Sequence, residues 1–490
     1  MDELINAMPT PFLEPFKVRK YSPLFTSQKL RVPMDHNQSV KIIEVSKVTP
    51  SAQESTVPKS LPLTFFDLIW LRFHPIQRLF FYELSSTELS FLDAILPNLK
   101  ASLALALRYY LPVAGSLVWP QHYAVPAVEF VEGDGVVLTV AESDADFYHL
   151  AGNGFREIEA YHPLVPQLAV SDDRAAVIAI QLTLFPNKGF SIGITNHHAV
   201  LDGRTSTSFV KLWAHLCNLL VTSGSSIPTT DEFMPFYDRS AINDPKGLTG
   251  IYANAWLNYE GPNNRSLKLK IPNTRPGLIR CTLKFTHQDM QKLKQWVLKE
   301  RQNSHISSFA LTTAYLCVCI AKSNGTREGN LAFGFPADAR SRLKPPLPSN
   351  YFGNCVSVRG VFIERTELLG EKGIVVGSKA ISEAVKSLEE GALDRAERWC
   401  KFMIASIGND SGEKMITVGG SPKFEVYSAD FGWGKPRKVE LVSSESPTTV
   451  SLTDSGDGDG GIEIGVVKER DELEGFAALF VKGLESDFES

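Results

Sequence analysis

A predicted β-hairpin that runs into a helix constrains this chain more than any other stretch of its sequence. Residues 176–185 (AVIAIQLTLF) are typical of a buried strand, residues 186–189 of a tight turn, and residues 190–195 of the returning strand. After this hairpin the apolar side chains recur at helical spacing, at Phe209, Leu212, Trp213, Leu216 and Leu220. His198 and Asp202 therefore fall at a strand-to-helix corner, where loop residues can face a cleft while regular elements hold them.

This corner carries residue types that can move a proton. Histidine is the side chain best matched to accepting a proton near neutral pH. Asp202, four residues further on, can fold back across the turn that Gly203 helps to close and fix the imidazole or its neighbouring backbone. By spacing alone, however, the pattern favours a core histidine beside a helix-capping aspartate.

A second stretch, Asp430-Phe-Gly-Trp-Gly-Lys-Pro436, lies far downstream. With His198-Ala-Val-Leu-Asp202 it resembles the HxxxD and DFGWG motifs of the plant BAHD acyltransferases. Further matches follow in the family's order: residues 43–47 (IEVSK), 61–67 (LPLTFFD), 110–115 (YLPVAG), 236–240 (FYDRS), 337–342 (ADARSR) and 351–355 (YFGNC). The resemblance covers about residue 40 to the C-terminus. Residues 61–67, 351–355 and the form HAVLDG are most similar to the flavonoid and phenolic-glucoside malonyltransferase branch.

The resemblance implies an α/β fold of two chloramphenicol-acetyltransferase-like domains, each a mixed sheet with flanking helices, with the active site in a channel between them. A chain of 490 residues also suggests two domains of ordinary size. We predict an N-terminal extension over 1–39, a domain carrying HxxxD over 40–221, a crossover linker over 222–245 and a domain carrying DFGWG over 246–490. The small polar residues of 222–230 are typical of a linker.

Local patterns predict further elements within these domains. Apolar side chains at 91, 92 and 95 indicate a short helix that Pro97 ends, followed by an amphipathic helix that stops before Pro112. Strands are predicted over 414–418, 424–429, 448–453 and 462–466, with the glycine- and aspartate-rich run 454–460 as a hairpin tip rather than a calcium loop.

Composition excludes several classes of function. The net charge of −5 argues against a nucleic-acid surface. No apolar run approaches the ~20 residues that span a bilayer. The six cysteines are scattered and form neither a disulfide framework nor a metal set, which fits a reducing, cytoplasmic location.

By resemblance, the reaction transfers an acyl group from a coenzyme A thioester to a hydroxyl without an acyl-enzyme. His198 would act as the general base, and the Trp433 indole N–H is the candidate donor to the tetrahedral oxyanion. Asp202 would be structural, in a salt link to a nearby arginine for which Arg342 is the candidate. Asp430 would brace the loop that Gly432 and Gly434 let turn, with direct proton transfer as its alternative role.

The resemblance also places the coenzyme A phosphates near the strand and helix of residues 280–308, which makes Arg280, Lys292, Ser307 and Ser308 candidates. Surface lysines on a helix are, however, usually only solvated. A malonyl donor carries a free carboxylate, so the acyl end of the site needs a cation. Arg204, two residues past Asp202, is the nearest in sequence, and its fork suits a carboxylate.

Other chemistries lack their sequence context. A metal centre at His197, His198 and Asp202 is disfavoured, because consecutive strand residues point to opposite faces. Gly189-Phe-Ser-Ile-Gly193 resembles a serine-hydrolase elbow, but its serine falls inside a predicted strand. We therefore expect no metal and no permanently bound cofactor, with malonyl-CoA as a co-substrate.

These observations predict an O-acyltransferase that malonylates the glucose hydroxyl of a flavonoid or phenolic glucoside and works as a monomer. One alternative is transfer of a coumaroyl or caffeoyl group to anthocyanin glucosides at a near-identical site. A second is a non-catalytic binding protein of the same fold. The sequence leaves the acceptor open, because acceptor loops vary.

Overall fold

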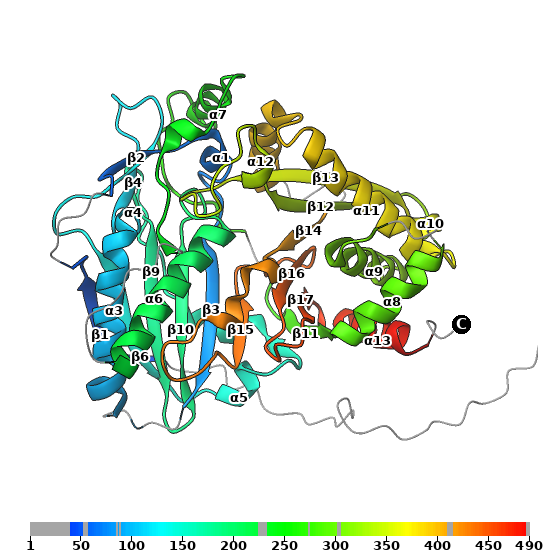
Figure 1. The fold of residues 1–490 in the computed structure, drawn as a ribbon, viewed down its shortest axis with the longest axis horizontal. Helices are drawn as coiled ribbons and strands as arrows, with labels where there is room; N and C mark the ends of the chain where they lie inside the picture. The colour runs from blue at the N-terminus through cyan, green and yellow to red at the C-terminus, as the bar shows by residue number, and fades with distance from the viewer. Residues whose placement is uncertain are drawn as a thin grey trace, which may run out of the picture. The chain divides into compact units, whose positions relative to one another are not determined.

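Three β-sheets organise the part of the chain that the computed structural model describes, namely residues 40–51, 57–84, 87, 90–223, 233–272, 275–300, 305–408 and 415–486. The first sheet has the strand order β1-β6-β9-β10-β3-β15. In that order, the strands span Val40–Val48, Val136–Ser143, Ile178–Phe185, Gly189–Asn196, Ile76–Glu83 and Lys438–Leu441. Figure 1 shows β10 near the middle of this sheet.

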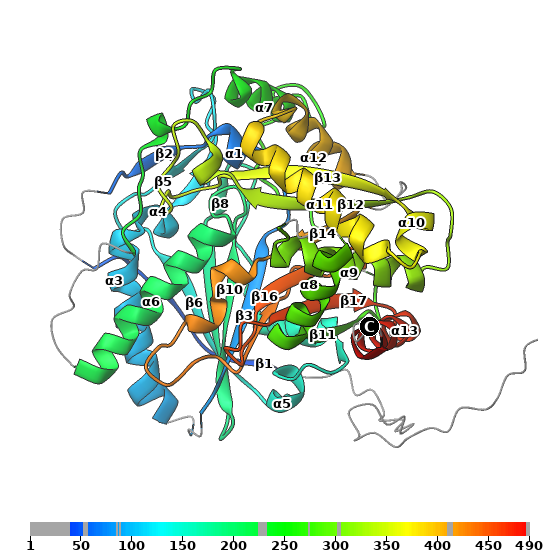
Figure 2. The same cartoon turned by 45° about the vertical axis from the view of Figure 1, so that its right-hand side comes forward.

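The predicted hairpin forms the centre of the first sheet. β10 pairs antiparallel with β9 and with β3, so that Asn196 lies opposite Ile178 and Ile76. Both β9 and β10 are buried along their whole length, which explains why their sequence is a nearly continuous apolar run. The helices α3 (Leu96–Tyr109) and α6 (Gly203–Ser223) pack together over this sheet (Figures 1 and 2).

The contact between α3 and α6 is locked by a polar bond inside an apolar interface. Trp213 of α6 is fully buried, and its indole N–H lies 3.1 Å from both the Leu99 carbonyl and the Ser102 hydroxyl of α3. A buried tryptophan needs such a partner for its N–H. α6 is thereby held in place, and its first turn carries the predicted site.

The second sheet has the order β13-β12-β14-β16-β17-β11-β7. In that order, the strands span Val356–Glu364, Asn330–Asp338, Ile416–Gly419, Thr449–Asp454, Ile462–Lys468, Ile279–Phe285 and Arg156–Glu157. The helices grouped beside it in Figure 2 are α8 (His287–Glu300), α9 (Ser308–Ser323), α10 (Arg365–Leu369), α11 (Gly373–Glu390) and α13 (Arg470–Ser486). Mixed strand directions and flanking helices agree with the predicted fold class.

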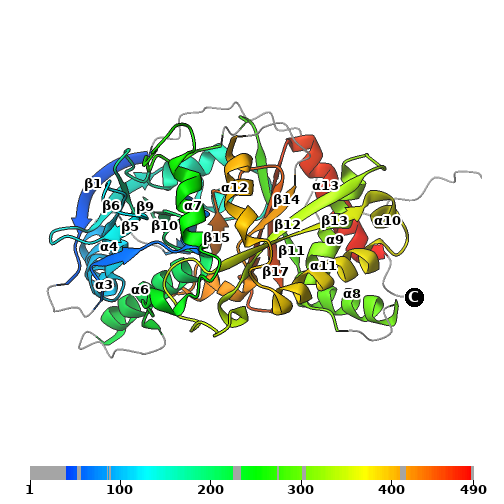
Figure 3. The same cartoon turned by 90° about the horizontal axis from the view of Figure 1, so that it is seen from above.

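The remaining elements are short. A third sheet has the order β2-β5-β4-β8, with strands at Ser60–Pro62, Ala127–Glu129, Ser116–Val118 and Arg174–Ala176. The other α-helices are α1 (Phe65–Leu68), α4 (Leu111–Ala114), α5 (Phe147–Leu150), α7 (Leu248–Leu257) and α12 (Trp399–Gly408). Figure 3 shows α7 and α12 near each other between the elements of the two large sheets.

The two large sheets exchange strands. β15 belongs to the first sheet although β14 and β16 lie in the second, and β7 joins the second sheet from the earlier half of the chain. The described residues after residue 39 accordingly form one compact unit. The predicted boundaries at 40–221, 222–245 and 246–490 stay a prediction, and the predicted extension 1–39 lies outside the described residues.

Buried charges stabilise the place where these strands cross. Arg280 of β11 donates to the carbonyls of Leu441, Val442 and Ser444 at 2.8–3.1 Å. Its guanidinium also lies 3.2 Å from Glu440, which is 3.2 Å from Arg156 of β7. All three ionic side chains are almost fully buried. The crossing is therefore a packed polar junction rather than a flexible connection.

Two local predictions were wrong. Residues 424–429 are not a strand but parts of two 3₁₀ turns, Pro422–Phe424 and Val426–Ser428, separated by Glu425 at a φ of 51°. Pro97 does not separate two helices. It lies in the first turn of α3, directly after the π-helical turn Phe91–Ile95, and the helical backbone continues through it.

Candidate active site at the His198 corner

His198 lies in the turn that follows β10, and the residue is half-buried. Its imidazole stacks on the indole of Trp70 with ring centres 4.1 Å apart and planes 5° from parallel. Phe73 meets the same ring edge-on at 5.6 Å. The side chain is thus positioned by aromatic packing.

This environment controls the ionisation of His198. Burial lowers its pKa to about 4, and the nearby His74 acts in the same direction, while Asp202 opposes both. The Nδ1 atom is buried without a hydrogen-bond partner among the described residues. The imidazole is consequently neutral near pH 7 and able to accept a proton.

His197 has a structural environment. It is fully buried, its Nδ1 accepts a bond from the Ala199 N–H at 3.2 Å, and burial lowers its pKa to about 3. His197 is therefore a neutral packing residue, and its neighbour His198 is the one that remains partly exposed.

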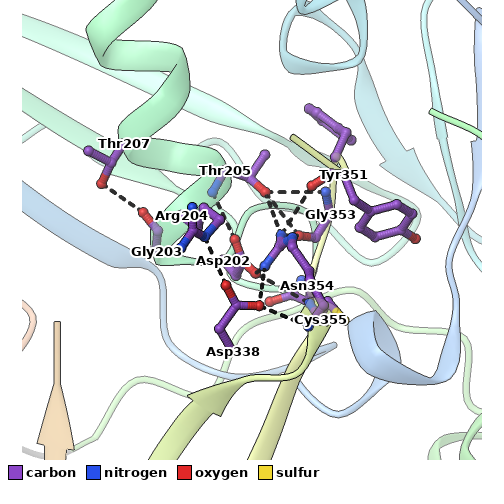
Figure 4. A network of polar contacts seen from close by, with 12 residues as sticks. Asp202, Gly203, Arg204, Thr205, Thr207, Asp338, Tyr351, Gly353, Asn354 and Cys355 are labelled. Atoms are coloured by element: carbon purple, nitrogen blue, oxygen red, sulfur yellow. Dashed lines mark hydrogen bonds and ion pairs between the residues drawn. The ribbon is translucent and has the colours of Figure 1, made fainter. Parts of the chain in front are cut away.

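Asp202 caps helix α6 and ties the corner to the second sheet (Figure 4). One carboxylate oxygen accepts from the Thr205 N–H at 2.8 Å, and the other from the Cys355 N–H at 3.2 Å. The second oxygen also lies 2.9 Å from the guanidinium of Arg340. The Arg340 charge and these hydrogen bonds hold the pKa of Asp202 below its usual value despite complete burial.

The predicted salt link of Asp202 is confirmed, but Arg342 as its partner is wrong. Arg340 and Arg342 share one 3₁₀ turn, in which side chains two positions apart point in different directions. Arg342 donates to Glu389 at 2.8 Å and to the Asp338 carbonyl at 2.6 Å. Arg340, by contrast, is buried and also donates to the carbonyls of Tyr351 and Gly353.

A second buried aspartate, which the sequence prediction missed, supports the His198 backbone. Asp67 is fully buried, and one of its carboxylate oxygens caps α1 by accepting from the Thr64 N–H. The other oxygen accepts from the backbone and side-chain N–H groups of Asn354 at 2.8 and 3.0 Å. The side-chain amide of Asn354 donates in turn to the His198 carbonyl at 2.9 Å. Asp67 and Asn354 both occur in stretches that carried the family resemblance.

Arg204 extends from the first turn of α6 towards the end of β12. Its Nε lies 2.8 Å from a carboxylate oxygen of Asp338, and about a third of its side chain stays exposed. Figure 4 shows this contact between Arg204 and Asp338 next to Asp202. Arg204 therefore lies close to the His198 corner, as predicted, but its guanidinium is already paired with Asp338.

The DFGWG stretch lies elsewhere. Asp430 accepts hydrogen bonds from the N–H groups of Gly432 and Gly434 at 2.8 and 3.0 Å, and both glycines have positive φ, 103° and 99°. This geometry is that of a brace for a tight loop. It provides no contact between Asp430 and His198.

Trp433 as an oxyanion donor is a prediction that the structure contradicts. Its ring packs edge-on against Phe190, with centres 6.2 Å apart, at the start of β10. His198 follows the other end of β10, and the six positions from Phe190 to Asn196 alone span roughly 20 Å. Independently, a Cβ added at Gly432 would meet Asn218 and Val221 at the end of α6, whereas Asp202 caps its beginning. The two motifs therefore lie at opposite ends of the same elements.

The predicted coenzyme A residues separate into two groups. Arg280 is buried and committed to Glu440 and three carbonyls, so it is not free to meet a phosphate. Lys292 is exposed on α8, Ser308 is exposed at the start of α9, and Ser307 caps α9 by accepting from the Ala310 N–H at 3.2 Å. A helix N-terminus suits a phosphate, so Ser307 and Ser308 stay candidates, and Lys292 stays one as an exposed cation.

Within the described ranges, no group of three or more His, Cys, Asp or Glu side chains could hold a metal ion. No helix in that part of the chain combines the length and apolar character needed to cross a membrane.

The fold is shared with two solved structures. Vinorine synthase superposes with a TM-score of 0.67 at 17% identity, covering 92% of this chain and 100% of that one. The F. sporotrichioides TRI101 protein, complexed with coenzyme A and T-2, gives a TM-score of 0.63 at 15% identity, covering 84% and 96%. The chain therefore shares its whole two-sheet α/β fold with these proteins.

The sequence comparisons narrow this class to a family. The model described as the Transferase family matches residues 38–481. Phenolic glucoside malonyltransferase 1 of Arabidopsis thaliana is 39% identical over 91% of this chain and 98% of its own length. The malonyl-CoA:anthocyanidin 5-O-glucoside-6''-O-malonyltransferase of the same plant is 39% identical over 92% and 100%. The chain belongs to this family, the plant BAHD acyltransferases.

Proposed function

We propose that this acyltransferase moves a malonyl group from malonyl-CoA to a glucose hydroxyl of a flavonoid or phenolic glucoside. The relatives named above bear such activities in their names and match nearly the whole chain. The observation that carries the proposal is the neutral, half-buried imidazole of His198, which burial holds ready to accept a proton. A general base positioned in this way typically contributes ~10²–10⁴ in rate.

In the proposed reaction, His198 removes the proton from the acceptor hydroxyl as its oxygen attacks the thioester carbonyl. Nε2 is the accepting atom, because Nδ1 is buried. Collapse of the tetrahedral intermediate breaks the carbon–sulfur bond, and the protonated imidazole returns its proton to the departing thiolate. The products are the malonyl ester and free coenzyme A, and no covalent bond to the enzyme forms.

Each support of His198 has a separate task in this scheme. Trp70 and Phe73 exclude water from the ring and fix its plane, while Asn354 fixes its backbone carbonyl. Asp202 keeps α6 capped and joined to Arg340, so it acts on the position of His198 rather than on the substrate.

The malonyl carboxylate needs a cation, and we propose Arg204 for this role. Its guanidinium is part-exposed close to the corner, and its Nε is already paired with Asp338. Arg204→Ala should therefore lose the preference for malonyl-CoA over coumaroyl-CoA. A retained preference would remove Arg204 from the proposal without affecting His198.

The cellular setting proposed is the cytoplasm, with the enzyme working as a monomer. The six cysteines are all free and buried, as expected for a reducing compartment.

Lys292, Ser307 and Ser308 are proposed to contact the coenzyme A phosphates, because they lie on exposed positions of α8 and at the start of α9.

The proposal is tested by mass spectrometry of products from a mixed panel of acyl-CoAs and glucosides. Malonyl esters of phenolic or flavonoid glucosides are expected. Products carrying only coumaroyl or caffeoyl groups would support the alternative donor. One relative, the agmatine coumaroyltransferase of A. thaliana, is 36% identical and has such a donor group in its name.

The matched control compares His198→Ala with His197→Gln. The first removes the proposed base and should lower turnover by ~10²–10⁴. The second removes a histidine from the packed side of the strand end and should keep turnover within a few-fold in the folded fraction. Unchanged turnover in His198→Ala would favour a non-catalytic binding protein.

A further inference from the structure

A cavity of about 300 Å³ lies at one edge of the second sheet, apart from the His198 corner. It is formed where β12, β14 and β16 begin and β17 ends, and residues of α9 and α13 contribute to its lining. The apolar side chains that line it are Ile320, Leu331, Ile416, Val450, Val466 and Phe476. Its volume falls at the lower limit of ligand pockets in proteins, ~300–1,000 Å³.

The cavity is remote from the proposed chemistry. β12 connects the two places, because Leu331 lines the cavity and Asp338 pairs with Arg204 at the corner. The seven positions between them span roughly 23 Å of strand. Along α9, Ile320 at the cavity is likewise thirteen positions, or roughly 20 Å, from the proposed phosphate contact Ser307.

Arg365 gives this cavity a recognition group. It lines the cavity directly after β13, and its Nη1 is buried without a hydrogen-bond partner in the part of the chain that the structure describes. The residue is half-buried, and no ion pair of Arg365 occurs within the same residues. The Arg365 guanidinium therefore has no counter-charge among the described residues and is available to an anion that enters the cavity.

A second cation lies on the opposite wall. Lys468 ends β17, and only 12% of its side chain is exposed. Its pairing with the exposed Glu472 is long, at 3.6 Å. The cavity thus combines apolar walls with positive charge at both sides and no carboxylate among its lining residues.

We propose that this cavity binds a small aromatic carboxylate, with the carboxylate on Arg365 and the ring between the apolar walls. A guanidinium presents paired donors that match a carboxylate, and a flat apolar body fits between side chains of a sheet and its helices. This site goes beyond the malonyl transfer proposed above, because neither the thioester nor the sugar hydroxyl passes through it.

The test is isothermal titration calorimetry of the full-length protein with benzoate and with benzamide, which serves as a matched neutral probe. Benzoate is expected to bind, and benzamide to bind at least tenfold more weakly, because it lacks the charge that Arg365 would pair with. Arg365→Gln should weaken benzoate at least tenfold. Arg398→Gln, an exposed arginine away from the cavity, should leave binding unchanged.

Two further measurements keep the outcome decisive. Ala332→Leu narrows the cavity from its wall and should also weaken benzoate, with circular dichroism confirming that each variant is folded. His198→Ala and saturating coenzyme A should leave benzoate binding intact. Equal binding by the parent and Arg365→Gln, displacement of benzoate by coenzyme A, or no binding of benzoate at 10 mM would each overturn the site. None of these results depends on whether malonyl transfer occurs.

Discussion

At position 198 the imidazole is surrounded by aromatic rings rather than oriented by a carboxylate. The carboxylate four residues away, Asp202, is engaged by Arg340 and by two backbone N–H groups. Burial against Trp70 and Phe73, together with His74, therefore sets the ionisation of His198. This arrangement keeps the base neutral without a partner that would compete for the proton.

Replacing Trp70 tests this arrangement at the residue scale. Trp70→Leu should lower kcat by roughly 10–10²-fold with little change in KM, because the ring loses its fixed plane. Water would then reach the imidazole and raise the pKa of His198 from about 4 towards 6.5. Since the base form is lost below its pKa, the acidic limb of the pH–rate profile should move to higher pH.

Trp70→Phe provides the matched comparison, since a phenyl ring can still stack on His198. It should recover most of kcat and restore the acidic limb. If Trp70→Leu keeps the parent acidic limb, the aromatic rings do not control the ionisation of His198.

The Asp202–Arg340 pair allows a second residue-scale prediction. Asp202→Asn leaves a buried guanidinium without its counter-charge and should destabilise the fold by ~3–5 kcal/mol. The double variant Asp202→Asn/Arg340→Met should be less destabilised than the sum of the two single changes. Urea denaturation at pH 7 measures all three.

Arg342→Met is the control for this pair, because Arg342 meets Glu389 at the surface, with 61% of the Glu389 side chain exposed. Its removal, which also breaks one hydrogen bond to the Asp338 carbonyl, should cost only ~1–2 kcal/mol. A larger loss in Arg342→Met than in Arg340→Met would contradict the assignment of the buried partner.

At the scale of elements, β10 and α6 act as spacers that separate the two family motifs. Both elements begin or end at the His198 corner, and both contact the DFGWG loop at their other end. The loop is braced by Asp430 and packs on Phe190, so its contribution is to hold the ends of β10 and α6 together.

Trp433→Phe tests this separation. An oxyanion donor that is removed costs ~10²–10³ in kcat. Because Trp433 packs far from His198, Trp433→Phe should instead keep kcat and KM within about threefold and lower the melting temperature by a few degrees. Steady-state kinetics below the melting transition, with a thermal scan, distinguish the two outcomes; a hundredfold loss of kcat in a fully folded variant would restore the oxyanion role.

At the scale of the whole molecule, the exchanged strands join the two large sheets through buried charge. Glu440 of β15 lies within 3.2 Å of both Arg156 of β7 and Arg280 of β11, and 3.7 Å from Lys438. These three cations keep the pKa of Glu440 at about 2 although the residue is buried. Unfolding either sheet would break this cluster, which favours a cooperative transition.

Glu440→Gln should therefore destabilise the protein by ~3–5 kcal/mol near pH 7, since it leaves buried cations uncompensated. The folded-state pKa of Glu440 is depressed, so its stabilising effect is complete above pH 4.5 and is lost as the pH falls towards 2. The difference in unfolding free energy between parent and variant should shrink on acidification below pH 4.5. Urea denaturation between pH 7 and 3.5 measures it.

Glu425→Gln serves as the control at this scale. Glu425 pairs with Lys211 at 3.1 Å but is 70% exposed, so its loss should cost no more than ~1 kcal/mol. Equal effects of the two variants would show that the buried cluster does not join the sheets.

Local sequence patterns determined the elements around the site. The apolar runs of β9 and β10, the glycine turn between them and the helical spacing of α6 follow from burial and periodicity, and the structure has all three. The helix-capping role of Asp202 also follows from local sequence, because a cap bonds within its own first turn. The prediction failed for residues 424–429, where Glu425 adopts a positive φ that no apolar pattern reveals.

Only the tertiary structure decided which distant residues meet. Whether Asp202 pairs with Arg340 or Arg342 depends on the direction of one 3₁₀ turn, and Arg280 turned inward to the crossing of β15 instead of outward to solvent. Trp433 matched a family motif, yet β10 and α6 hold it far from His198. The physical reason is that spacing along a chain fixes neighbours within a few residues, whereas long-range proximity is set by how sheets and helices pack.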